Sequence, residues 1–130
     1  MLHPHELREG NWILSFDPRE ASANKKVFSQ VTWRHIRAME VEKKNNFEPI
    51  SLTNELLARC NWTQKDGNQT FFHPKFQDYI VLQKTDKGYN TLLQQNATIG
   101  EAMNYLHQLQ NRYYSLVFEE LNVDMNNYKV

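Results

Sequence analysis

The chain has 130 residues, and its 15 Lys and Arg residues are balanced by 15 Asp and Glu residues. A chain of this length can bury enough apolar surface to fold as one domain without a disulfide or a structural metal. The charge balance argues against a protein built mainly to bind nucleic acid or an anionic membrane surface, because both kinds of binding depend on an excess of Lys and Arg.

Cys60 is the only cysteine, so neither an intramolecular disulfide nor a thiolate zinc site can form within one chain. It ends an apolar run with helical spacing, which predicts a small buried side chain rather than a nucleophile. The N-terminal residues lack the basic and apolar segments of a signal peptide, and no apolar run is long enough to span a membrane. We therefore expect a soluble cytoplasmic protein that does not bind a membrane.

The first half of the sequence predicts two short strands and one short helix. Large apolar residues between turn-forming segments are typical of strands. Thr32 is a favourable N-cap for the helix, and the residue before Pro49 is pushed out of the helical region. We expect a loose lead-in at residues 1–10, a strand at 11–16 and a loop at 17–24. A second strand is expected at 27–31, a helix at 33–39, a loop at 40–46 and an extended segment at 47–50.

The middle of the sequence predicts a second short helix followed by an antiparallel meander. Thr53 is a good N-cap, and Glu55 in the first turn complements the helix dipole, so a helix is expected to run from there to about residue 61. Turn-forming residues then alternate with β-branched and aromatic runs, and connections this short imply antiparallel pairing. We expect an extended piece at 62–63, turns at 66–68 and 86–88, and strands at 70–73, 79–83 and 89–93.

The C-terminal third predicts one long helix. Thr98 and Glu101 match the capping box that satisfies two free amide groups at a helix start. An apolar stripe at helical spacing follows, and residues 122–130 are expected to form a frayed tail. The stripe comprises Ala102, Leu106, Leu109, Tyr113, Leu116 and Val117. The expected fold is a single α+β domain over residues 1–130, in which an antiparallel sheet of about five strands packs against this helix, with two short helices.

A polar and aromatic face lies beside that stripe. In one interpretation its amides and imidazole bond to nearby backbone, because buried polar groups normally find partners within the protein. In the other, the face binds a partner protein, because such side chains combine contact area with adaptable hydrogen bonding. The candidate partner-binding residues are His107, Gln110, Asn111, Tyr114 and Phe118.

Three blocks of sequence resemble one family. They run from Glu6-Leu7-Arg8 to Gly10-Asn11-Trp12, from Glu48-Pro49-Ile50 to Leu52-Thr53, and from His107-Gln108-Leu109-Gln110-Asn111 to Tyr113. The pattern is similar to a family of short uncharacterised bacterial proteins, many of them encoded in phage or prophage regions. Members of this family often have Thr-Gly before Glu-Glu-Leu, where this chain has Val117-Phe118 before Glu119, so the comparison implies that the last helix continues to about Leu121. The resemblance implies no activity and no catalytic residues. Its context favours a protein that binds a partner, and host machinery is one possible target.

Catalytic and metal-binding patterns are weak throughout the sequence. The five histidines show no zinc-binding spacing, and with four glycines the chain has no phosphate-binding loop. We therefore predict no catalytic residues, no metal and no cofactor, and we expect a non-enzymatic protein.

A local basic strip supports an alternative function, nucleic-acid binding. Basic side chains next to an exposed aromatic ring can hold phosphates while a base stacks. The residues of this strip are Lys25, Lys26, Trp33, Arg34 and Arg37. A solvated helix face with charged loops is the simpler interpretation, given the neutral total charge.

The leading hypothesis is a phage-type or prophage-type interaction module whose partner is another protein, of host or phage origin. Nucleic-acid binding is the first alternative, and a small enzyme or small-molecule binder is the second. The mark of the last class would be a deep pocket with convergent polar groups. Association with a second copy of the chain is compatible with the number of aromatic residues.

Overall fold

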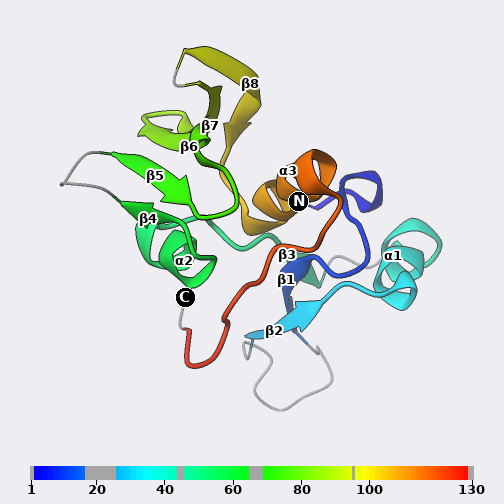
Figure 1. The fold of residues 1–130 in the computed structure, drawn as a ribbon. Helices are drawn as coiled ribbons and strands as arrows, with labels where there is room; N and C mark the ends of the chain where they lie inside the picture. Colours follow the sequence, from blue (N-terminus) through cyan, green and yellow to red (C-terminus); the bar gives the residue numbers. More distant parts are fainter. Residues whose placement is uncertain (1, 17–25, 44–45, 65–68, 95, 129–130) are drawn as a thin grey trace. The chain divides into compact units, whose positions relative to one another are not determined.

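The computed structural model describes residues 2–16, 26–43, 46–64, 69–94 and 96–128. These residues form two antiparallel sheets and several helices (Figure 1), which confirms the α+β class. The chain divides into two compact units: unit 1 is Met1–Ser51 with Tyr105–Glu120, and unit 2 is Leu52–Asn104 with Leu121–Val130. Compactness does not establish independent folding, so the expectation of one domain stays a prediction.

Some sequence predictions fall outside the described residues. These are the loop at 17–24, the basic residue Lys25 and the turn at 66–68.

Unit 1 contains a three-stranded sheet built from segments far apart in the sequence. Strands β1 (Trp12–Phe16), β2 (Lys26–Gln30) and β3 (Phe47–Glu48) pair antiparallel in the order β2-β1-β3. Helix α1 (Trp33–Glu40) follows β2, as predicted. The predicted strand pair therefore exists, but it belongs to a separate sheet rather than to the sheet of the meander.

The N-terminal residues belong to the core of unit 1, although the sequence suggested a loose lead-in. A short 3₁₀ helix, η1 (Pro4–Glu6), lies between two buried leucines. Gly10 adopts a φ of +95°, a conformation that suits glycine, and its N–H donates to the carbonyl of Val31 at 2.9 Å. The buried core that these residues join consists of Leu2, Leu7, Ile13, Val31 and Met39.

Helix α3 (Leu106–Val117) lies in unit 1, where it packs against β1. It buries Leu106, Leu109 and Tyr113, three residues of the predicted stripe. Leu116 and Val117 are half-buried, and Ala102 lies outside the helix. The sequence predicted that this helix covers the meander. The structure instead assigns α3 to unit 1, while the meander belongs to unit 2.

The prediction that α3 starts after Thr98 is wrong. Residues Ala97–Met103 form strand β8, and the helix begins only at Leu106. The side chain of Gln108 accepts the N–H of Tyr105 at 3.1 Å, and this contact supplies the helix cap. A capping-box pattern is compatible with other backbone conformations, and here the β-branched pair Thr98-Ile99 and the pairing with strand β7 (Gly88–Leu93) favour a strand.

The prediction that α3 continues to about Leu121 is also wrong. The helix ends at Val117, and Phe118 takes the left-handed conformation, with φ 59° and ψ 28°. The N–H of Phe118 donates to the carbonyl of Tyr114 at 2.8 Å, which closes the last turn. A glycine is therefore not needed to stop the helix here, although glycine is the usual residue at such a position.

Unit 2 contains the predicted antiparallel meander, with the extended piece expected at 62–63 as a strand on one side and β8 on the other. Its sheet has the order β4-β5-β6-β7-β8. Asp86 and Lys87 form the two-residue turn between β6 and β7, and Gly88 follows with a φ of +128°. A Cβ at Gly88 would lie 2.6 Å from the carbonyl oxygen of Met103, so glycine is required there. The strands are β4 (Thr63–Gln64), β5 (Thr70–His73), β6 (Gln77–Thr85), β7 (Gly88–Leu93) and β8.

Helix α2 (Asn54–Arg59) belongs to unit 2 and begins as predicted. The hydroxyl of Thr53 accepts the N–H of Leu56 at 3.1 Å, which is the expected N-cap contact. Cys60 follows the helix and is fully buried, and this burial raises the pKa of its thiol to about 12. The thiol is therefore a protonated core group, as the sequence indicated.

The C-terminal residues pack on α2, although a frayed tail was predicted. Tyr128 is 8% exposed, and its ring lies 5.1 Å from the guanidinium carbon of Arg59. The Nη1 of Arg59 donates to the carbonyls of Asp124 and Asn126 at 3.0 and 2.6 Å. These contacts hold the tail as far as Tyr128 within unit 2.

Candidate functional site

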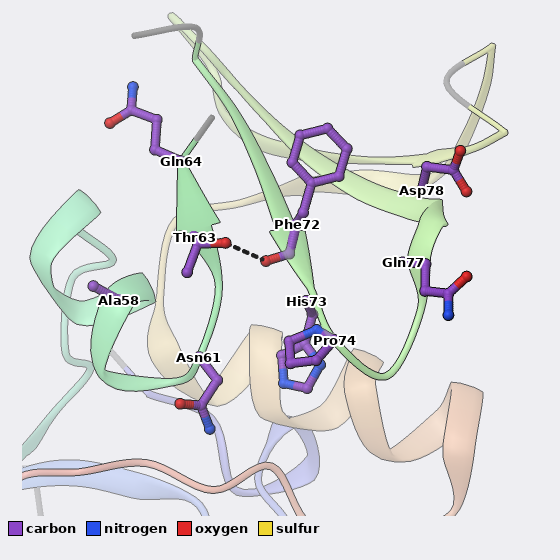
Figure 2. Close-up of a pocket in the computed structure, with 9 residues that line it drawn as sticks. All are labelled: Ala58, Asn61, Thr63, Gln64, Phe72, His73, Pro74, Gln77 and Asp78. Atoms are coloured by element: carbon purple, nitrogen blue, oxygen red, sulfur yellow. Dashed lines mark hydrogen bonds between the residues drawn. The ribbon is translucent and has the colours of Figure 1, made fainter. Parts of the chain in front are cut away.

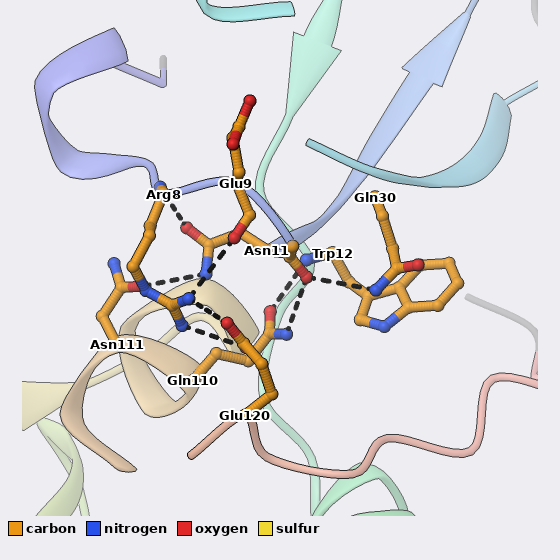
Figure 3. A network of polar contacts seen from close by, with 9 residues as sticks. Arg8, Glu9, Asn11, Trp12, Gln30, Gln110, Asn111 and Glu120 are labelled. Carbon is orange, nitrogen blue, oxygen red and sulfur yellow. Dashed lines mark hydrogen bonds and ion pairs between the residues drawn. The ribbon is translucent and has the colours of Figure 1, made fainter. Parts of the chain in front are cut away.

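The two amide side chains predicted to bind a partner are engaged within unit 1 (Figure 3). Gln110 is 1% exposed; its Oε1 accepts the N–H of Trp12 at 2.8 Å and its Nε2 donates to the carbonyl of Gly10 at 3.2 Å. Asn111 donates to the carbonyl of Glu6 at 3.0 Å and accepts from the Asn11 amide at 2.8 Å. Together they attach residues 6–12 to α3, which is the structural interpretation of this face.

His107 is also engaged within unit 1. It is 1% exposed, its ring stacks on that of Tyr105 at 5.9 Å, and its Nε2 lies 3.5 Å from a carboxylate oxygen of Glu6. Burial is the main cause that lowers the pKa of His107, and the charge of Glu6 partly opposes it. The imidazole is therefore neutral near pH 7 and acts as a packing residue.

Tyr114 and Phe118 are the two predicted partner-binding residues that remain accessible. Tyr114 is 37% exposed and Phe118 is 79% exposed. The guanidinium of Arg8 lies 4.3 Å from the centre of the Tyr114 ring. The same guanidinium forms an ion pair with Glu120 (Figure 3). We call these four residues, Arg8, Tyr114, Phe118 and Glu120, the aromatic end of α3.

Phe118 combines two locally unfavourable features. Its left-handed backbone conformation is costly for a residue with a bulky side chain, because the Cβ crowds the backbone. Its ring is the most exposed of the large apolar side chains in the described part of the chain. Neither feature is offset by burial of the ring, and such outliers often mark functional positions.

The basic strip predicted for nucleic acid is only partly assembled. Trp33, Arg34 and Arg37 lie on α1 and are exposed, and the Arg34 guanidinium lies 5.5 Å from the Trp33 ring. Lys26 instead pairs with Glu48 across the sheet at 2.8 Å. The structure therefore brings together an aromatic ring and one guanidinium, but one lysine of the strip is neutralised.

Unit 2 contains a pocket that the sequence analysis did not identify (Figure 2). Its volume is about 710 Å³, within the range of small-molecule sites. The pocket lies where α2 ends, beside β4, β5 and the start of β6. Its lining residues come from three separate segments, so no local sequence pattern identifies it. They are Ala58, Asn61, Thr63, Gln64, Phe72, His73, Pro74, Gln77 and Asp78.

His73 lies at the base of this pocket and is 7% exposed. Its Nδ1 accepts the N–H of Lys75 at 3.0 Å, and a backbone hydrogen bond links it to Cys60. Burial lowers the pKa of His73 more than this backbone bond raises it. The neutral ring thus fixes the turn after β5 against the end of α2, and its role is structural.

No group of three or more His, Cys, Asp or Glu side chains gathers at a metal-binding distance in the described part of the chain. No described helix combines the length and apolar content needed to cross a membrane. Comparison with known proteins found no matching family model, no matching curated protein and no matching solved structure.

Proposed function

We propose that this protein is a non-enzymatic interaction module that binds another protein through the aromatic end of α3. The observation that carries the proposal is Phe118, an exposed aromatic residue in a left-handed conformation at the end of a helix. A few residues supply most of the binding energy in a protein interface, and aromatic and arginine side chains are enriched there. The surface is smaller than the one predicted from the sequence, because His107, Gln110 and Asn111 serve the fold.

The expected partner presents an apolar recess that accepts the Phe118 ring. The two charges of this surface, Arg8 and Glu120, form an ion pair, so they offer little net charge to a partner. Binding should therefore depend on apolar burial and change little with salt. Nucleic-acid binding through α1 would instead weaken steeply as salt increases.

The sequence resemblance to bacterial phage and prophage proteins makes a bacterial host protein the partner to seek. A photo-reactive amino acid at position 118 should form an adduct with one protein in a bacterial lysate. The same group at position 41, where Val41 is 67% exposed directly after α1, is the control and should not form that adduct. Identical adducts from both positions would refute the proposed surface. An adduct between two copies of this chain would show that the surface mediates self-association instead of binding a different protein.

A further inference from the structure

The pocket of unit 2 has a lining suited to an uncharged ligand. The amides of Asn61, Gln64 and Gln77 can each donate and accept hydrogen bonds. Among the described lining residues Asp78 is the only one with a charge at neutral pH, and it is negative, so a phosphate or carboxylate ligand would be repelled. The polar chemistry therefore favours a ligand with many neutral donors and acceptors.

An apolar surface lies among these polar groups. In Figure 2 the Phe72 ring stands between Gln64 on one side and Asp78 on the other. Pro74 adds a second apolar ring to the lining. A sugar ring has the complementary chemistry, since its C–H face is apolar and its hydroxyl rim donates and accepts hydrogen bonds.

The backbone holds two of the amides in unusual positions. Asn61 has a φ of 67° and Gln77 a φ of 54°. Gln77 pairs with His73 where the register between β5 and β6 shifts, so an irregularity in the sheet positions it. Left-handed conformations are uncommon for a residue such as Gln and often occur where a site constrains the chain.

We propose that this pocket binds a neutral sugar, either a disaccharide or the end of a longer glycan. Phe72 provides the stacking surface, and the amides of Asn61, Gln64 and Gln77, with the Asp78 carboxylate, bond to the hydroxyls. This site lies in unit 2 and is independent of the aromatic end of α3. The result of a sugar-binding test therefore neither supports nor contradicts the proposed protein binding.

The test is a titration of the ¹⁵N-labelled full chain, followed by NMR. The probes are maltose, cellobiose and chitobiose, with glucose 6-phosphate and a short uncharged peptide for comparison. Millimolar neutral disaccharide should shift the side-chain amide signals of Asn61, Gln64 and Gln77. The indole N–H signal of Trp62 should also shift, because its ring lies 5.1 Å from that of His73.

A matched pair of variants assigns the site. Gln77→Gly removes the amide at a position where glycine adopts the backbone conformation readily, and it should weaken sugar binding at least about tenfold, a loss typical of one buried hydrogen bond. Gln94→Gly is the same substitution at another left-handed residue, with φ 51° and outside the pocket, and it should leave binding unchanged. The proposal is overturned if no neutral disaccharide shifts these signals, if only the phosphate or the peptide does, or if Gln77→Gly binds as tightly as the native chain.

Discussion

Phe118 combines a backbone conformation that is costly for phenylalanine with a ring that is exposed to solvent. Glycine populates the left-handed region without the steric cost of a Cβ, whereas phenylalanine does not. The exposed ring recovers little of that cost within the chain, because it is 79% exposed. We therefore expect that phenylalanine at position 118 contributes little to the stability of the fold and contributes mainly to binding.

Phe118→Gly should leave the free energy of unfolding unchanged or raise it by up to about 1 kcal/mol, because relief of strain offsets the greater freedom of the unfolded chain. Urea denaturation of the native chain and the variant measures the difference. Lys43→Gly, at another exposed residue with φ 56°, is the control and should behave similarly. A clear loss of stability in Phe118→Gly alone would mean that the ring supports the fold.

His107 makes stability depend on pH. Its pKa is lowered from 6.5, chiefly by burial, so the unfolded chain binds a proton there more readily than the folded chain does. Stability is then greatest above the unfolded pKa and falls as pH decreases through 6.5 toward the lower folded pKa. His73 shifts in the same direction, also mainly through burial.

Urea denaturation of the native chain at about pH 7 and about pH 5 should show this loss, and His107→Leu should show a smaller one. The comparison within each protein removes the effect of the substitution on packing. If the variant loses as much stability as the native chain over this interval, protonation of His107 is not the cause.

At the scale of the element, α3 is held by an apolar stripe and by a buried amide. Leu109 is 2% exposed on the apolar side. Leu109→Ala should lower the free energy of unfolding by about 2–5 kcal/mol, through lost burial and the cavity that remains. Leu116→Ala, at a half-buried position of the same helix, should cost less. Equal effects in thermal or urea denaturation would show that the helix buries a different face.

Gln110→Leu tests the buried amide, because leucine has a similar size and cannot accept the N–H of Trp12. The unfolding free energy should fall by about 1–3 kcal/mol for the buried donor left without a partner. Urea denaturation measures this loss. An unchanged free energy of unfolding would contradict the structural role of Gln110 and would favour the partner-binding role that the sequence suggested.

The elements that the sequence predicts well are those with local signals. Thr53 caps α2, and the Asp86-Lys87 turn closes the β6–β7 hairpin, so both follow from a few adjacent residues. The start of α3 cannot be predicted in this way, because Thr98 and Glu101 match a helix-capping pattern although both residues lie in strand β8. Local patterns compete, and pairing with β7 decides the outcome.

The candidate sites depend on contacts across long sequence separations, and this limits their prediction. The face of α3 is identifiable from its spacing, but only the structure shows that Gln110 bonds to residues about 100 positions earlier. The pocket of unit 2 is assembled from three segments and has no motif. Pairing of β3 with β1 is equally non-local, since α1 lies between them in the chain.

At the scale of the whole molecule, the residues that hold the fold differ from those of the two proposed binding sites. In unit 1 the amides of α3 hold residues 6–12, while Phe118 at the aromatic end stays exposed. The pocket lies in unit 2. The two proposed sites share no residue, so variants at each should affect one kind of binding only.

The most direct test of this account is calorimetric titration of the partner captured from position 118 with three forms of the chain. Phe118→Gly should raise the dissociation constant at least about 30-fold, the loss of about 2 kcal/mol expected for a dominant interface residue. Lys43→Gly should bind as the native chain does. Native affinity in Phe118→Gly, with its fold intact, would contradict the claim that the aromatic end of α3 is the binding surface.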